Sequence, residues 1–175
     1  TQVVQAGLSA VLVEGAVAYA TGEREAATKL LANVAVRTLP RLLVAPVALA
    51  QAATIEEERG GTVLAILDEA RLSAPGTLAE EAALRRSVDL LTRDGAVTEA
   101  IAMLAKYLWR FGGSIHADAV LSRAVSAIAG NPRISDQIIG VTSSLKRLEP
   151  DVRNEMWLAI AQVSVGQGAL DLVRH

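Results

Sequence analysis

Glycine and proline interrupt this sequence at short intervals, and the segments between them carry apolar residues at helical spacing. Few stretches alternate apolar and polar residues in the way that a half-buried strand does. Such segments predict about 9–10 α-helices of roughly 8–20 residues, with short connections that make successive helices antiparallel. The predicted interruptions lie at Gly22, Pro40, Gly60-Gly61, Pro75-Gly76, Asp94-Gly95, Gly112-Gly113, Asn131-Pro132, Pro150 and Gly166 to Gly168.

The interruptions also recur with a period, because the helix ends predicted at positions 39, 75, 112 and 150 are 36, 37 and 38 residues apart. The tetratricopeptide pattern places a small residue, a large apolar residue four positions later and a helix end eight positions beyond that. We therefore predict an all-α fold in which antiparallel helix pairs stack into a tetratricopeptide-like right-handed solenoid. A plain helical bundle with coincidental spacing is the alternative. The matching pairs are Ala27 and Leu31, Val63 and Leu67, Ala100 and Leu104 and, less closely, Ile138 and Thr142.

The amino-acid composition limits both the residue types that can form the core and the functions that the chain can have. Hydrophobic residues make up 51% of the chain and aromatic residues only 3%, so we expect a core of Ala, Leu, Val and Ile. Such small side chains let helices approach closely. The net charge is -2 and no run of Lys and Arg occurs, so the sequence lacks the basic patch that nucleic-acid binding requires. The lack of cysteine excludes disulfides, a thiolate zinc site and a cysteine nucleophile.

The length of 175 residues predicts a single helical-repeat domain over residues 1–175. We expect this domain to be a piece of a longer chain, because the sequence opens at Thr1 without the pattern of a targeting peptide. The stretch Val3–Ala20 is apolar enough to suggest a membrane span. Glu14 lies inside it, however, and a charge near the centre of a bilayer costs about 2.5–3.5 kcal/mol. A buried helix of a soluble domain is therefore expected there.

Residues that could carry chemistry have simpler structural explanations. His116 and Asp118 are two positions apart, so their side chains diverge on a helix and we predict a surface or capping histidine. Adjacent glutamates, such as Glu80 and Glu81, also diverge and cannot face one substrate from two sides. Gly60-Gly61 and Gly112-Gly113 lack the Lys-Ser/Thr of a phosphate loop. We predict no catalytic residue, no cofactor and no metal. The alternative, a helical hydrolase, needs two carboxylates about 5–10 Å apart in a pocket.

Some helix starts are also predicted by their chemistry. Thr77 and Glu80 have the spacing of a capping box, in which each side chain binds a backbone N–H of the first turn. Ser114 can cap the helix that follows Gly112-Gly113. Glu81 and Arg85 have the favourable order of an i,i+4 ion pair.

A binding surface is predicted from the helix-pair register, since the first helix of each tetratricopeptide pair lines the concave face. Arg85, Asp89 and Arg123 would then point into a groove, which would suit an amphipathic helix or an extended segment. Trp109 and Tyr107 cannot share one helix face, so at least one of them should be exposed, and an exposed Trp is a good interface anchor. The register adds Leu12, Ala16, Tyr19, Ala48 and Ala52 to the groove, and the predicted protein-binding residues are Leu12, Tyr19, Glu81, Arg85, Asp89, Trp109 and Arg123.

The run LDEARLSAPGTLAEEAALRRSVDLLTRDGAVTEAIAMLAKYLWRF (Leu67–Phe111) resembles MotC, a family of periplasmic motility proteins of the alphaproteobacterial flagellar motor. Its most specific block is Ala74–Arg86, and KYLWRF (Lys106–Phe111) follows at the expected place. EGAVAYATGEREAATKLL (Glu14–Leu31) and MWLAIAQVSVGQGAL (Met156–Leu170) are similar to the segments before and after it. The chain departs from the family at Trp109 and at His116.

The resemblance implies a non-catalytic periplasmic protein whose partner is the periplasmic part of the stator protein MotB. Its implied role is the assembly or stability of the stator, and hence rotation of the flagellar motor. The alternative is a generic tetratricopeptide-like adaptor or assembly chaperone with no link to motility.

Overall fold

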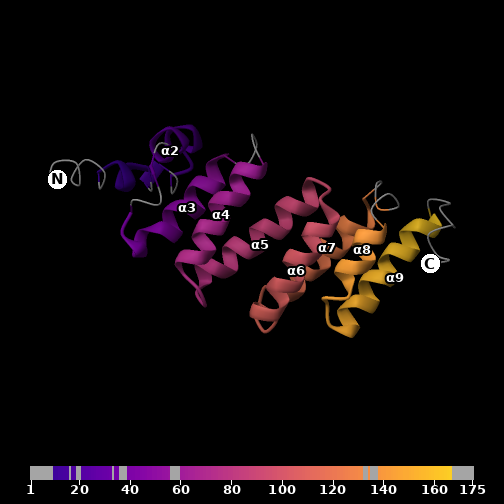
Figure 1. Ribbon diagram of the computed structural model, residues 1–175. Helices are drawn as coiled ribbons and strands as arrows, with labels where there is room; N and C mark the ends of the chain where they lie inside the picture. Colours follow the sequence, from indigo (N-terminus) through magenta and orange to yellow (C-terminus); the bar gives the residue numbers. More distant parts are fainter. Residues whose placement is uncertain are drawn as a thin grey trace. The chain divides into compact units, whose positions relative to one another are not determined.

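The computed structural model describes residues 10–15, 17–18, 21–32, 34–35, 39–55, 60–131, 134 and 138–166. All regular structure in these residues is helical, and no β-strand occurs among them, which confirms the predicted all-α class (Figure 1). Residues 10–15 and 17–18 are helical as well. The bounded helices are α2 (Arg24–Leu31), α3 (Arg41–Ile55), α4 (Gly60–Ser73), α5 (Leu78–Arg93), α6 (Val97–Phe111), α7 (Ala117–Ala129), α8 (Ile138–Leu145) and α9 (Pro150–Gly166).

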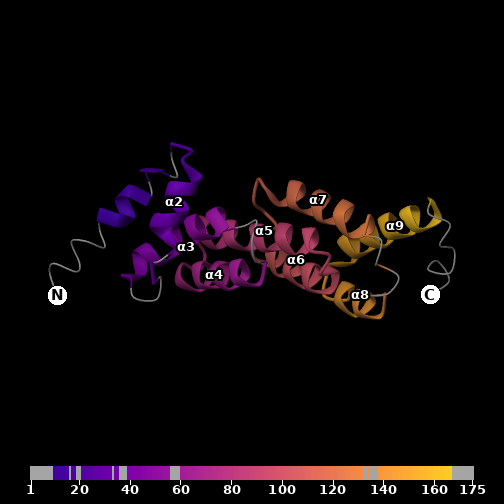
Figure 2. The ribbon, with the colours of Figure 1, turned by 90° about the horizontal axis from the view of Figure 1, so that it is seen from above.

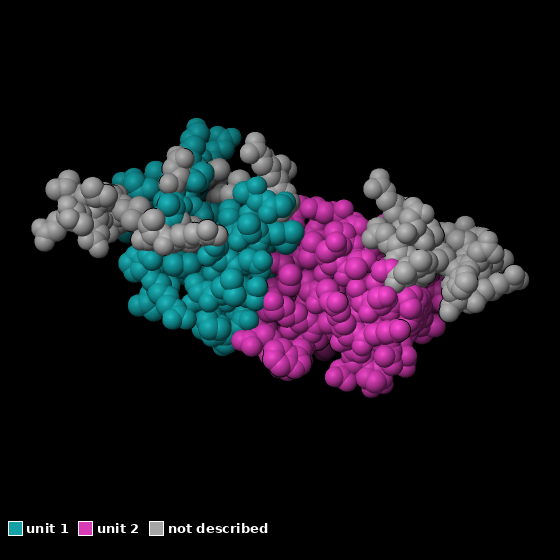
Figure 3. Space-filling view, viewed as in Figure 1, with its two compact units in different colours: residues 1–83 teal, residues 84–175 magenta. Residues whose placement is uncertain are grey.

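The chain divides into two compact units, Thr1–Ala83 and Leu84–His175, which are the teal and magenta parts of Figure 3. We call them unit 1 and unit 2. The boundary falls inside α5, so that helix contributes its first turns to unit 1 and the remainder to unit 2.

Unit 1 is built around α3, which packs against both α2 and α4. The face of α3 that lies inside the unit carries small residues, and Ala48 and Ala52 are completely buried. Alanine allows the backbones of packed helices to approach closely, because no bulky side chain separates them. Val63 and Leu67 of α4 are also fully buried, as the periodic pattern predicts.

A buried amide joins α3 to the end of α2. The side-chain Nε2 of Gln51 donates to the carbonyl oxygens of Leu31, at 2.5 Å, and of Val34, at 2.9 Å. The last carbonyls of a helix have no partner within the helix, so a buried donor at this place satisfies groups that would otherwise cost free energy. Gln51 itself is buried. The amide thus fixes the place where the chain leaves α2.

In unit 2 the helices pack in an alternating order, α6 against α8 and α7 against α9. α6 contacts α7 and α8, while α7 contacts α9, and both views show these helices side by side (Figures 1 and 2). Ile101, Leu104 and Tyr107 of α6 are completely buried at the centre of this stack. At Gly140 of α8 an added Cβ would lie 2.7 Å from Oγ1 of Thr98, so α6 and α8 approach closely only because this residue is a glycine.

Thr77 and Glu80 both bind backbone N–H groups at the start of α5, as predicted, but Glu80 reaches the residue before Thr77. The backbone N–H of Glu80 lies 3.5 Å from Oγ1 of Thr77, and Oε2 of Glu80 accepts from the backbone N–H of Gly76 at 2.6 Å. Ser114 acts differently from its prediction. Its hydroxyl accepts from the N–H of His116 at 3.2 Å, whereas the cap position of α7 is His116 itself. Ser114 therefore shapes the turn before α7 and does not cap the helix.

Two predicted interruptions lie at the start of a helix. Gly60-Gly61 follows the boundary between α3, which ends at Ile55, and α4, which begins at Gly60. Pro150 is likewise the first residue of α9, where proline is favoured because its missing N–H would have no helical partner. The helix predicted to end near Leu39 ends at Leu31. The ends predicted near Pro75 and Gly112 agree with α4, which ends at Ser73, and with α6, which ends at Phe111.

Within the residues that the structure describes, no helix is both long enough and apolar enough to cross a membrane. Most of the apolar stretch Val3–Ala20 lies outside the described residues.

Candidate functional site

Asp89 of α5 and Arg123 of α7 form an ion pair in unit 2. Both carboxylate oxygens of Asp89 accept from Nη2 of Arg123, at 3.2 and 3.3 Å, and Oδ1 also accepts from Nε at 3.4 Å. The two side chains keep 44% and 52% of their surface exposed. An exposed pair of this kind contributes little to stability, about 0–1 kcal/mol. Its charges therefore remain available for contacts with another molecule.

The pair lies at an open hollow of about 740 Å³ between the end of α5 and the second half of α7. The helical spacing predicts Asp89 and Arg123 on one surface, and in the structure their side chains contact each other. Arg85, one turn earlier on α5, is half-buried and does not line the hollow. We call this surface the α5–α7 hollow, and its lining residues are Asp89, Thr92, Arg93, Ser122, Arg123, Ser126 and Ala127.

Of the other predicted residues of unit 1, those that the structure describes are buried or partly buried. Ala48 and Ala52 are completely buried in the core, so their predicted position in a groove is wrong. Leu12 is partly buried against a cluster formed by Val34, Leu39, Val44 and Val47. Glu81 is only 5% exposed, so it lies inside the protein and not on its surface. Tyr19 and Ala16 lie outside the described residues.

Trp109 and Tyr107 of α6 differ in exposure, as predicted. Tyr107 is completely buried and packs against Phe111, with ring centroids 6.1 Å apart, whereas Trp109 is 81% exposed. The guanidinium of Arg110 lies 5.9 Å from the centroid of the Trp109 ring, within the range of a cation–π interaction. Unit 2 thus presents a large aromatic side chain on its surface.

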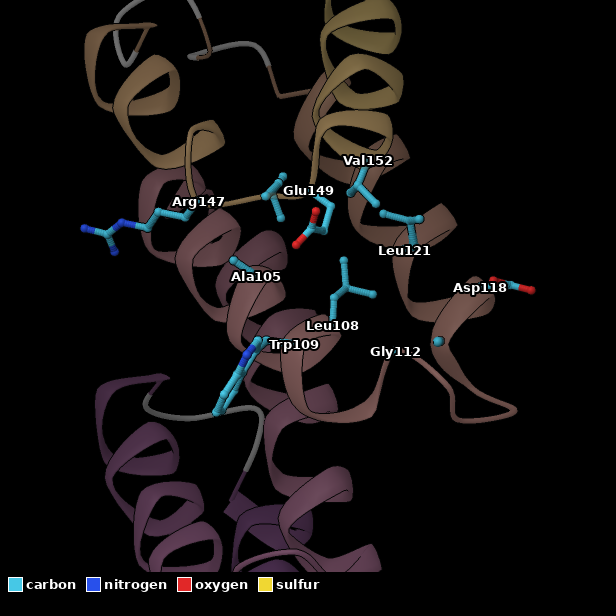
Figure 4. A pocket seen from close by; sticks show the side chains of 11 residues that line it. Ala105, Leu108, Trp109, Gly112, Asp118, Leu121, Arg147, Glu149 and Val152 are labelled. Carbon is cyan, nitrogen blue, oxygen red and sulfur yellow. The ribbon is translucent and has the colours of Figure 1, made fainter.

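Beside Trp109 lies a cavity of about 450 Å³ (Figure 4). Its walls come from α6, α7, the turn after α8 and the first turn of α9. No sequence pattern predicts this cavity, since its lining residues are far apart in the chain and only helix packing brings them together. We call it the α6–α9 cavity, and it is lined by Ala105, Leu108, Trp109, Gly112, Ala117, Asp118, Leu121, Arg147, Leu148, Glu149 and Val152.

A hydrolase with an acid pair needs two carboxylates that converge in a pocket, and the α6–α9 cavity contains carboxylates. Two carboxylates line it, but Figure 4 shows the Asp118 side chain directed outward while that of Glu149 lies within the cavity. They do not face one position from two sides, as an acid pair must. Among the described residues there is also no group of three His, Cys, Asp or Glu side chains that could hold a metal ion. His116 is exposed.

The fold and the site define an all-helical protein whose surface carries an exposed tryptophan, an open hollow beside an ion pair and a cavity with aliphatic walls. A family model described as chemotaxis protein MotC matches residues 2–175, which is nearly the whole chain. The chain therefore belongs to the MotC family, as the block at Ala74–Arg86 predicts. Membership of this family supports a role related to motility. Comparisons with curated proteins and with solved structures gave no match.

Proposed function

We propose that this chain is a non-catalytic periplasmic protein that binds the periplasmic part of the stator protein MotB and is required for rotation of the flagellar motor. The observation that carries the proposal is the family match over residues 2–175. The surface of unit 2 supports a binding role, because the α5–α7 hollow presents opposite charges that are accessible to a partner. Charges at such a surface select a partner and its orientation more than they add affinity.

The finer architecture belongs to the same proposal. In unit 2, α6 packs against α8 and α7 against α9, which is how successive helix pairs stack in a tetratricopeptide solenoid. We propose a right-handed stack of this kind, in which α5 and α7 lie at the surface that receives the partner.

The binding test uses the whole chain and the purified periplasmic region of MotB, with the dissociation constant measured by titration calorimetry. We expect binding at micromolar concentrations. Arg123→Glu should weaken it about tenfold, which corresponds to about 1.4 kcal/mol, because it places two like charges at the hollow. Arg85→Glu should weaken it less, because Arg85 is half-buried and lies outside the hollow. No interaction at tens of micromolar, with both proteins folded, would contradict the proposal.

A charge exchange separates binding from structure. The double variant Asp89→Arg with Arg123→Asp keeps an ion pair between α5 and α7 but reverses its polarity. A partner that contacts these charges loses affinity, whereas a pair that only holds two helices together leaves affinity unchanged. The matched control exchanges Asp68 and Arg71, an ion pair on α4 with a distance of 3.0 Å. We expect the control to bind MotB as the unaltered chain does.

The second candidate function, a generic adaptor or assembly chaperone, is favoured by the same helix-pair stacking in unit 2. It predicts that unrelated peptides bind as tightly as MotB does and that the charge exchange has no effect. A motility assay separates the two: in a motile host that lacks its own copy, the gene restores swimming only if the first proposal holds.

A further inference from the structure

The α6–α9 cavity has an apolar interior and one charged group within it. Figure 4 shows Leu108, Leu121 and Val152 around the centre of the cavity. The carboxylate of Glu149 lies among them, whereas the side chains of Arg147 and Asp118 extend away from the cavity. The interior therefore offers aliphatic contacts and one negative charge.

The Glu149 carboxylate has no partner within the described part of the chain. No hydrogen bond or ion pair involves its side chain there, and the one bond at this residue is from the backbone N–H of Arg153 to its backbone carbonyl, at 2.9 Å. The residue is exposed, so water solvates the charge. Any molecule that covers the cavity removes this water, and a buried carboxylate without a partner is costly. A covering molecule must therefore bring a positive charge to Glu149.

Trp109 provides the second part of the surface. Its side chain lines the cavity from α6 and is almost fully exposed, while the neighbouring Arg110 covers part of the ring. Exposed tryptophans beside a cavity are common anchors of protein interfaces, since they bury a large area with few rotatable bonds. The volume of about 450 Å³ is large enough to take whole side chains from a partner.

We infer that the α6–α9 cavity binds an amphipathic helix of a partner protein that presents a Lys or Arg beside aliphatic side chains. The cation pairs with Glu149, the aliphatic groups contact Leu108 and Leu121, and Trp109 packs against the outer side of the helix. This site is lined by none of the residues of the α5–α7 hollow, so it goes beyond the proposed function and does not depend on MotB.

The probe is a model amphipathic helix of leucine and lysine, with a matched peptide in which every lysine is glutamate. The chain contains two tryptophans, so Trp157→Phe makes Trp109 the single emitter. Binding of the Leu/Lys peptide should shift the Trp109 emission to the blue, because the indole moves from water into an apolar contact. Anisotropy of a labelled peptide gives the affinity of every variant, including those without Trp109.

We expect Trp109→Ala to weaken binding of the Leu/Lys peptide by more than about tenfold, and Glu149→Gln by about fivefold. Glu155→Gln removes one negative charge from an exposed position of α9 that does not line the cavity, and it should leave affinity unchanged. Thermal melting followed by circular dichroism verifies that each variant is folded.

Four results would overturn the inference. They are equal affinity for the Leu/Lys and Leu/Glu peptides, equal losses for Glu149→Gln and Glu155→Gln, absence of a blue shift on binding, and absence of binding altogether. None of them bears on the α5–α7 hollow, because the MotB titration uses substitutions at other residues.

Discussion

The two units are built around different cores. In unit 1 the central helix buries the small residues Ala48 and Ala52 together with the amide of Gln51. In unit 2 the central helix buries the larger Leu104 and Tyr107. A core of small residues depends on close backbone contact and on satisfied polar groups, whereas a core of large residues depends on the apolar area that it removes from water. The units should therefore respond to different substitutions.

Four polar side chains also differ in burial between the units. Those of unit 1, Glu81 and Gln51, lie inside the protein. Those of unit 2, Asp89 and Arg123, lie at its surface, and Trp109 of the same unit is also exposed. Both proposed binding surfaces therefore lie in unit 2.

The largest expected effect comes from a charge in the core of unit 2. Leu104→Asp should destabilise the unit by about 4 kcal/mol or more, because it buries a carboxylate without a partner and leaves a cavity. Both tryptophans lie in unit 2, so urea unfolding followed by tryptophan emission reports on this unit. The matched control, Leu158→Asp on the exposed side of α9, should shift the transition little. A cooperative transition within a few tenths of molar urea of the unaltered chain would show that Leu104 is not a core residue.

The next effect concerns the buried amide of unit 1. Gln51→Met keeps the length of the side chain but removes both donors to the carbonyls of Leu31 and Val34. Leaving buried carbonyls without donors should cost about 2–3 kcal/mol. The measurement is urea unfolding followed by helical circular dichroism, with Gln162→Met on the exposed face of α9 as the control.

Comparing the two signals for Gln51→Met tests the contrast between the units. If the cores are separate, the substitution shifts the circular dichroism transition and leaves the tryptophan transition in place. Coincident shifts of both signals would show that the units unfold as one, and the comparison would then have to be abandoned.

The helical class and the core positions could be predicted from the sequence because they depend on local spacing. Ala27, Leu31, Val63 and Leu67 recur at the pattern's positions, and each is buried. The helix boundaries were predicted less well. Proline and glycine can begin a helix as well as end one, as Pro150 and Gly60 do, and the spacing of apolar residues does not distinguish the two cases.

The predicted groove residues differ in where the structure places them. Asp89 and Arg123 are 34 positions apart in the chain, and their side chains form an ion pair. Ala48 is buried, because α3 packs against both α2 and α4. Glu149 could not be found from the sequence, since its role depends on a cavity formed by the packing of α6, α7 and α9.

The smallest effect compares one glycine from each unit. Gly95 ends α5 with a φ of 72°, and the backbone N–H groups of Gly95 and Ala96 donate to the carbonyls of Thr92, at 3.2 Å, and Leu91, at 2.9 Å. An alanine there is strained by its Cβ, so Gly95→Ala should destabilise unit 2 by about 1–2 kcal/mol and shift the tryptophan transition.

Gly61, in the first turn of α4, has open space around its Cα and a helical backbone. Gly61→Ala should therefore stabilise unit 1 by about 0.4–1 kcal/mol, since it restricts only the unfolded chain. If both substitutions shifted their unfolding transitions by the same amount in the same direction, Gly95 would not adopt a left-handed backbone conformation.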